Sequence, residues 1–307
     1  MEVNPMDTIG DILTARVRQM AITAKQIREK MKGKESGNLQ NPQQGEALTV
    51  TSEIPLCPVD KCNGEGYYTI MKGGKDRFCR CDCYKLIIMQ RQMKFAEIPV
   101  EFCNLKVSDF DTQIYTTAKN RQIAETVKKI AIGYVKEFLQ EKAIGKGLYL
   151  YSDTNGSGKT RMAISIGNAL IKQYIQSVKF TTTINLLNEI KTTFNKDSND
   201  ITTEGGSFSA LLDAAKTVEV LILDDIGTER PTAWVGEVFY AILNDRMDAK
   251  MVTLFTSNCR VEDLQHEKKI ISRIARMAMP VKFPEESIRA SLAKQENETV
   301  LKMLLGN

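Results

Sequence analysis

The chain has 307 residues, of which 42% are hydrophobic and 26% are charged, and its formal net charge at pH 7 is +4. This composition is ordinary for a globular protein, and the length predicts two domains or one domain with appendages. No apolar run approaches a membrane span and no signal-peptide core is visible, so we expect a cytoplasmic protein without a membrane partner. With so small a net charge, nucleic-acid binding would have to come from local basic patches.

Residues 1–50 are expected to form a basic amphipathic helix and a flexible linker. Apolar side chains recur at helical spacing over residues 7–32, and seven Lys or Arg stand against one acid between Ala15 and Lys34. Residues 33–53 are polar and contain many small side chains, which is typical of a linker. The helix could dock on a partner or contact nucleic acid, but a helix lying on its own protein fits equally well.

Residues 51–97, which we call the cysteine module, contain a predicted zinc site. Five of the seven cysteines in the chain lie between residues 57 and 83, in a short glycine-bearing segment with little apolar content. Such spacing is typical of a closed tetrahedral zinc site in a small ribbon. Reduced cysteines in a loop are the alternative. The ligands we favour, with Cys83 in reserve as a fifth thiol, are Cys57, Cys62, Cys79 and Cys81.

Residues 98–307 are expected to form one ATPase domain. A basic helix over residues 84–96 leads to it and should end before Pro99, because proline disfavours helical geometry in the residue that precedes it. A connector over residues 100–112 and one long amphipathic helix over residues 117–141 follow. Gly145 and Gly147 then interrupt the helical pattern before a strand-length apolar run.

A phosphate-binding loop is predicted where this apolar run ends, because the loop closes on Gly-Lys-Thr and a helical pattern follows over residues 161–176. Glycines allow successive backbone N–H groups to turn toward an anion, and the helix N-terminus adds partial positive charge. Lys159 is expected to neutralise the β and γ phosphates of ATP, and Thr160 to coordinate Mg²⁺. The predicted nucleotide-binding residues are Asn155, Gly156, Ser157, Gly158, Lys159 and Thr160.

Asp153 is a departure from the usual loop pattern, which has glycine at this position. A carboxylate that pointed inward would repel phosphate, so we expect Asp153 to face solvent or a backbone N–H. The alternative for the whole stretch is a glycine- and serine-rich turn that only happens to precede Lys-Thr.

A second motif, which is acidic, supports the prediction of a phosphate-binding loop. After a strand at residues 178–183 and a helix at residues 184–194, a buried apolar strand ends in Asp224 and Asp225. This is a Walker B arrangement, in which Asp224 would order the Mg²⁺ shell and Asp225 would polarise the attacking water. An Asp-Asp turn on the surface is the alternative.

A further helix at residues 234–248 and a buried strand that begins at residue 251 lead to Asn258. ATPases with this pattern have a side-chain amide at this position, so we expect Asn258 to sense the γ-phosphate and to orient water. Strands that alternate with helices predict an α/β fold, a parallel sheet flanked by helices with the ligand at the carboxyl edge of the strands.

These motifs resemble the AAA+ domain of bacterial and phage replicative helicase loaders of the DnaC/DnaI type. The resemblance covers about residues 98–293, and a cysteine-rich zinc module before that domain is also similar to the DnaI type. The matching segments are residues 98–99, 180–182, 223–227 (LDDIG), 232–235, 242–246, 255–258 (FTSN), 271–274 and 287–289.

The resemblance implies a partner for each part of the chain. The N-terminal part would grip the replicative hexameric DNA helicase, while the ATPase domains would self-associate and contact single-stranded DNA. It also implies that Arg273 is an arginine finger that reaches a neighbour's nucleotide and that Arg289 senses the γ-phosphate in cis. ATP, Mg²⁺ and Zn²⁺ are the implied cofactors, and the implied function is ATP-dependent loading of the helicase onto single-stranded DNA during replication initiation.

Two other functions fit parts of the pattern. An IstB-like transposition helper ATPase would act on DNA and a transposase, although such proteins typically lack a zinc ribbon like that of residues 57–83. A scaffold that binds a partner and uses the phosphate loop only to fix its conformation is the third reading, and turnover stimulated by DNA would separate it from an ATPase.

Overall fold

The computed structural model describes residues 57, 61–197 and 206–305. The chain divides into two compact units, Met1–Glu53 and Ile54–Asn307, and every described residue belongs to the second unit. The predicted basic helix and linker therefore lie outside the described residues. Among the described helices, none combines the length and apolar character needed to cross a membrane.

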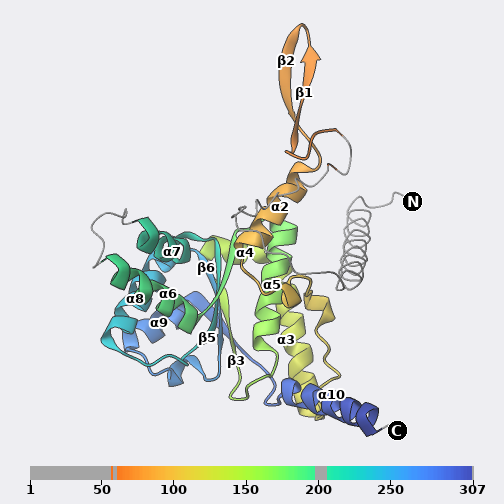
Figure 1. The fold of residues 1–307 in the computed structure, drawn as a ribbon. Helices are drawn as coiled ribbons and strands as arrows, with labels where there is room; N and C mark the ends of the chain where they lie inside the picture. The colour runs from red at the N-terminus through yellow and green to blue at the C-terminus, as the bar shows by residue number, and fades with distance from the viewer. Residues whose placement is uncertain (1–56, 58–60, 198–205, 306–307) are drawn as a thin grey trace, which may run out of the picture. The chain divides into compact units, whose positions relative to one another are not determined.

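A five-stranded parallel sheet forms the centre of the ATPase domain (Figure 1). Its strands lie in the order β4-β5-β6-β3-β7, so the phosphate-loop strand β3 is separated from the Walker B strand β5 by β6 alone. The predicted parallel α/β fold is therefore confirmed. The strands are β3 (Gly147–Tyr151), β4 (Val178–Thr182), β5 (Val220–Ile226), β6 (Val252–Ser257) and β7 (Ala278–Lys282).

Helices cover both faces of this sheet, and alternate residues of each strand supply the two cores. Leu148 and Ile222 face a core that includes α3 and α5, whereas Tyr149 and Leu223 face a core that includes α6, α8 and α9. The helices are α2 (Tyr84–Phe95), α3 (Ala118–Lys136), α4 (Phe138–Ile144), α5 (Lys159–Tyr174), α6 (Thr183–Asp197), α7 (Gly206–Thr217), α8 (Ala233–Asp248), α9 (Lys268–Met277) and α10 (Ile288–Leu305).

One predicted helix is wrong in detail, because the helix expected over residues 117–141 is interrupted at Glu137. The interruption coincides with Phe138, which is fully buried and packs its ring against Tyr134 and Tyr174. Burial of this aromatic ring favours two shorter helices over a continuous one. The second of them ends at Gly145, whose φ of +70° suits glycine.

The cysteine module contains an antiparallel ribbon of β1 (Tyr67–Lys72) and β2 (Lys75–Arg80), joined by a turn with Gly73 and Gly74 at positive φ. Helix α2 follows the ribbon, and Ala96 and Ile98 after it are buried in the core of the ATPase domain. The backbone O of Ala96 accepts a hydrogen bond from Phe180 N of β4 (2.9 Å), so the end of the module is tied to the sheet.

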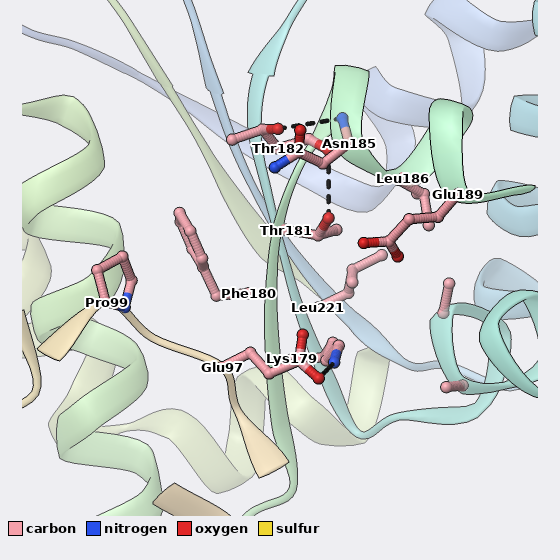
Figure 2. Close-up of a pocket in the computed structure, with 12 residues that line it drawn as sticks. Glu97, Pro99, Lys179, Phe180, Thr181, Thr182, Asn185, Leu186, Glu189 and Leu221 are labelled. Atoms are coloured by element: carbon pink, nitrogen blue, oxygen red, sulfur yellow. Dashed lines mark hydrogen bonds and ion pairs between the residues drawn. The ribbon is translucent and has the colours of Figure 1, made fainter. Parts of the chain in front are cut away.

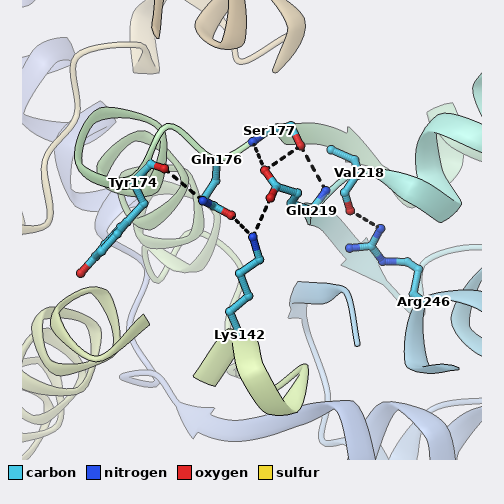
Figure 3. A network of polar contacts seen from close by, with 7 residues as sticks. All are labelled: Lys142, Tyr174, Gln176, Ser177, Val218, Glu219 and Arg246. Carbon is cyan, nitrogen blue, oxygen red and sulfur yellow. Dashed lines mark hydrogen bonds and ion pairs between the residues drawn. The ribbon is translucent and has the colours of Figure 1, made fainter. Parts of the chain in front are cut away.

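Arg246 joins β6 to the end of α7 from inside the domain, and Figure 3 shows its bond to the carbonyl oxygen of Val218, directly after α7. Its side chain is fully buried on α8 and donates to Thr253 Oγ1 and to the carbonyl oxygens of Ala215, Val218 and Val252. Burial lowers the pKa of Arg246 to about 9, which leaves the guanidinium charged at neutral pH. One buried cation therefore satisfies polar groups from two segments of the chain, residues 215–218 and residues 252–253.

Replacing Arg246 with methionine is expected to lower the free energy of unfolding by about 3 kcal/mol, because four buried acceptors lose their donor at once. The midpoint of unfolding in urea measures this loss. Arg276→Met is the matched control, since Arg276 is exposed on α9 and surface changes usually stay within about 0.5 kcal/mol. Equal midpoints for the two variants would contradict the structural role of Arg246.

Candidate nucleotide-binding site

The predicted phosphate loop joins β3 to α5, as its motif requires. Gly156 and Gly158 have φ values of +77° and +96°, which only glycine adopts without strain. A Cβ on Gly156 would lie 2.8 Å from Ser287 Oγ and 2.9 Å from Arg289 Cβ, so no larger residue fits there. The helix begins at Lys159, directly after Gly158. The loop thus has the backbone shape of an anion-binding nest at a helix N-terminus.

Lys159 supplies a buried cation inside this loop. Its side-chain nitrogen donates to the carbonyl oxygen of Thr154 (3.0 Å), and 5% of the residue is exposed. Burial lowers the pKa of Lys159, while the negative charges of Asp225, Glu285 and Asp224 act in the opposite direction. A cation that is held by neutral carbonyl and hydroxyl oxygens can turn to phosphate oxygens, with which it forms stronger, charge-assisted hydrogen bonds.

The two predicted Mg²⁺ ligands lie side by side. Thr160 Oγ1 donates to Asp224 Oδ1 across 2.8 Å, although the residues are far apart in the sequence. Burial raises the pKa of Asp224, against hydrogen bonds from Thr256 and Thr160 and the charge of Lys159. A hydroxyl and a carboxylate next to a phosphate loop are oxygen donors of the kind that Mg²⁺ prefers, so these residues fit the ion.

Asp225 has an unusual backbone conformation, with φ at +57°. Left-handed geometry costs a residue other than glycine about 1–2 kcal/mol, and such strain persists where neighbouring groups hold it. Here the backbone N of Asp225 donates to Thr256 Oγ1 (2.9 Å), and the backbone O of Asp225 accepts from Thr228 Oγ1 (2.7 Å). The carboxylate is half-buried.

Two further predicted residues lie beside the loop. Asn258 directly follows β6, the strand between β5 and β3, and is half-buried there. Arg289 is the second residue of α10, and its backbone N lies 3.4 Å from the carbonyl oxygen of Gly156. The positive charge of Arg289 also contributes to lowering the pKa of Lys159, after the larger effect of burial. Their roles toward a bound nucleotide stay predictions.

Arg273 lies elsewhere, on the surface that α9 shares with α8. Its guanidinium carbon is 4.1 Å from the centre of the Tyr240 ring, and Nη2 donates to Asn244 Oδ1 (3.0 Å). These described contacts are with α8, so the structure does not bring Arg273 together with the phosphate loop of the same chain. A finger that acts on a neighbour's nucleotide is compatible with this placement and stays a prediction.

Glu285 is a site residue that the sequence reading missed. Its Oε2 accepts hydrogen bonds from Ser152 Oγ (3.0 Å) and Thr154 Oγ1 (3.2 Å) at the start of the phosphate loop. Burial opposes ionisation, but these bonds and one from the Asp153 backbone lower the pKa of Glu285. Asp153 itself is exposed, as expected, so its backbone is used while its carboxylate points to solvent. No local pattern could have revealed a contact between residues so far apart in sequence.

A pocket of about 210 Å³ lies along β4 and the first turns of α6 (Figure 2). Its polar lining includes Lys179, whose ammonium pairs with Glu97 Oε1 at 2.5 Å. Neither the phosphate loop nor the Walker B carboxylates contribute to its wall. The nucleotide site is therefore assigned from the loop geometry and not from the size of a cavity.

Four thiols meet in the cysteine module. The sulfur atoms of Cys57, Cys62, Cys81 and Cys83 all lie within 4.8 Å of one another, and two pairs are 3.5 and 3.4 Å apart. A tetrahedral ion with bonds of about 2.3 Å to sulfur requires sulfur atoms about 3.8 Å apart, so the arrangement fits such an ion.

The cluster corrects one ligand that was predicted from the sequence, because it contains Cys83 and not Cys79. Cys79 lies within β2, paired opposite Tyr68 of β1 in the ribbon. The chain leaves the ribbon at Cys81, whose backbone N donates to Gly66 O, and turns into α2 directly after Cys83. The turn therefore brings Cys81 and Cys83, and not the strand residue, to the thiols before the ribbon.

Comparison with known proteins gives the family. The family of IstB-like ATP binding proteins matches residues 87–290. The replicative helicase loader DnaI of Bacillus subtilis is 31% identical over 192 residues, which are 56% of this chain and 58% of that protein. The replicative helicase loader DnaC of Buchnera aphidicola subsp. Baizongia pistaciae is 30% identical over 131 residues, 43% of this chain and 50% of that protein. The chain thus spans between half and three fifths of the length of these curated relatives.

Solved structures give similar matches. A crystal structure of DnaI matches with 28% sequence identity and a TM-score of 0.47, and the match covers 61% of this chain and 94% of the DnaI chain. A crystal structure of the DnaC helicase loader matches with 20% sequence identity and a TM-score of 0.48, and this match covers 60% of this chain and 99% of the DnaC chain. The family match includes the phosphate loop and the Walker B strand, and it confirms the resemblance and the predicted P-loop ATPase domain. The chain belongs to the family of IstB-like ATP-binding proteins.

Proposed function

We propose that this protein loads a replicative DNA helicase onto single-stranded DNA and uses ATP to do so. The observation that carries the proposal is the combination of a P-loop and Walker B site with a four-thiol cluster in one chain. Its likeness to the loaders DnaI and DnaC supports the same role. In this proposal, the cysteine module and the basic N-terminal residues bind the helicase, and the ATPase domain contacts single strands and associates with copies of itself.

The site residues divide the chemistry of hydrolysis among them. Lys159 neutralises the β and γ phosphates, and Thr160 and Asp224 hold Mg²⁺, which offsets charge on the phosphates when it is bound. Asp225 polarises the attacking water, and the amide of Asn258 orients it. Arg289 contacts the γ-phosphate from the same chain, and Arg273 reaches it from a neighbour.

Zn²⁺ is the proposed occupant of the thiol cluster, held by Cys57, Cys62, Cys81 and Cys83. Three of these residues are buried in a segment whose described hydrophobic cluster consists mainly of the thiols themselves. A closed four-thiolate site is structural and stabilises the fold to which it is bound.

Changing one thiol inside the cluster and one outside it tests this assignment. In the full chain, Cys83→Ser is expected to lose zinc and to expose the module to protease, whereas Cys79→Ser keeps a stoichiometric ion. Elemental analysis of the purified variants and the rate of limited proteolysis measure the difference. If Cys79→Ser lost zinc and Cys83→Ser retained it, the ligand set predicted from the sequence, which includes Cys79, would be the correct one.

Co-purification with the replicative helicase, with and without ATP, tests the proposed function. The full chain should be retained by the helicase, and ATP with single-stranded DNA should then increase the amount of helicase found on the DNA. A transposition helper is the second candidate, because the matching family is named for IstB. Binding to DNA that ATP stimulates, without retention by the helicase, would support that candidate and overturn the loader.

A further inference from the structure

Thr256 touches both Walker B carboxylate residues. It lies in β6 and is fully buried, and its hydroxyl makes two hydrogen bonds. Thr256 Oγ1 donates to Asp224 Oδ1 across 2.6 Å, and the same oxygen accepts from the backbone N of Asp225 at 2.9 Å. One hydroxyl group therefore joins the residue assigned to Mg²⁺ and the residue assigned to the attacking water.

The strand pairing shows why a side chain is needed at this point. Leu223 pairs with Phe255 and Ile226 pairs with Ser257, so Asp224 and Asp225 together stand opposite Thr256 alone. This is a β-bulge, and bulges next to active sites turn a side chain away from its regular direction. At the bulge, the Asp225 N–H is bound by the Thr256 hydroxyl in place of a backbone carbonyl.

The bulge changes where Asp225 acts. In a regular strand, two successive side chains point to opposite faces of the sheet. Here both Asp225 and Asp224 lie near enough to Lys159 for their negative charges to raise its pKa, against the larger effect of burial. The left-handed φ of Asp225 is part of this arrangement, and the Thr256 hydroxyl helps to offset its cost from the N–H side, while Thr228 Oγ1 donates to the backbone O.

We infer that Thr256 is a positioning residue for ATP hydrolysis, whose hydroxyl holds the bulge so that Asp225 faces the attacking water while Asp224 faces the metal ion. The inference rests on the proposed ATP hydrolysis and adds a residue to it. Asp224 has other support, because Thr160 also donates to its Oδ1 and Thr183 donates to its backbone O. Loss of the Thr256 hydroxyl should therefore displace Asp225 more than Asp224, and affect turnover more than ATP binding.

Thr256→Val, which has nearly the same shape without the hydroxyl, tests the inference. We expect kcat to fall on the order of 10–100-fold, as two hydrogen bonds at the site are lost, while the Kd for ATP stays within about threefold. Thr256→Ser should restore most of the turnover, because it returns the oxygen. If the valine variant does not fold, Thr256→Cys takes its place with the same expected loss, since a thiol is a weak donor and acceptor.

Thr253→Val is the matched control in the same strand. Thr253 is also fully buried, and its hydroxyl accepts from Arg246 at the other end of β6. That variant should lower the midpoint of unfolding and keep the turnover of the wild type at temperatures where it is folded. Wild-type turnover by Thr256→Val would overturn this inference but not the proposed ATP hydrolysis. A loss of ATP affinity that accounts for slower turnover would do the same. A wild-type protein that binds ATP without any turnover would overturn the proposed hydrolysis and this inference with it.

Discussion

Lys159→Ala is expected to abolish productive ATP binding, whereas Asp225→Asn is expected to bind ATP and fail to hydrolyse it. Lys159 is the cation of the phosphate loop and is already buried within it, where its ammonium is held by a loop carbonyl. Its removal leaves the β and γ phosphates without a charge-assisted donor from the loop, which should weaken affinity on the order of 100-fold.

Asp225 acts at a later step. Its neutral amide replacement keeps the size of the side chain and leaves the backbone bond to Thr256 in place, so binding of ATP should persist. Loss of the group that polarises water should lower kcat on the order of 10²–10⁴-fold. A combined measurement of ATP affinity and single-turnover hydrolysis separates the two variants.

The control for this pair is Lys136→Ala. Lys136 ends α3, and its side chain is 80% exposed and pairs with the neighbouring Glu137 at 3.7 Å, so both affinity and turnover should remain those of the wild type. If Lys159→Ala and Asp225→Asn gave the same ATP affinity, the division of roles between these two residues would be wrong.

The part of the site that the sequence predicts well is the part made by short, local patterns. The phosphate loop needs only a strand, two glycines, Lys159 and a helix, and all of them lie within residues 147–174. The Walker B strand is equally local, because a continuous apolar run must be buried and its last carboxylates must lie at the strand end. Parallel strands then place the two motifs at one edge of the sheet.

The features that the sequence reading missed depend on contacts between distant segments. Glu285 binds the start of the phosphate loop and Thr256 lies opposite the bulge, and no local pattern reveals either contact. Strand β7 was missed for a different reason, since Pro280 argues against a strand. The structure accommodates this proline because β7 is the last strand of the sheet and pairs only with β3.

The choice between Cys79 and Cys83 shows the same limit. Both thiols have metal-ligand chemistry and lie four positions apart, so spacing alone left the alternative open. The decision depends on where the ribbon ends, and pairing of β1 with β2 continues through Arg80. A register that ended two residues earlier would have freed Cys79 instead.

Arg273→Ala is expected to bind ATP normally and to hydrolyse it poorly, with a loss of about 10³–10⁵-fold in kcat of the assembled protein. A guanidinium from a neighbouring subunit stabilises the charge that develops on the γ-phosphate during transfer. The structure shows Arg273 resting on α8, over the Tyr240 ring and bonded to Asn244. Its Nε is buried and, within the described part of the chain, has no hydrogen-bond partner, so the side chain retains unused donors.

Mixing of variants distinguishes a finger that acts between subunits from a residue that acts within one chain. Arg273→Ala keeps an intact pocket and Lys159→Ala keeps an intact finger, so a mixture of the two should recover part of the activity that each lacks alone. Arg276→Ala is the matched control, because Arg276 is an exposed arginine one turn further along α9 and should hydrolyse ATP like the wild type. Wild-type turnover by Arg273→Ala would identify it as an ordinary surface arginine. If the two variants assemble together and no activity is recovered, Arg273 does not act on a neighbouring subunit. In such an assembly the intact Arg273 of one variant lies next to the intact nucleotide pocket of the other, and it should have restored hydrolysis there.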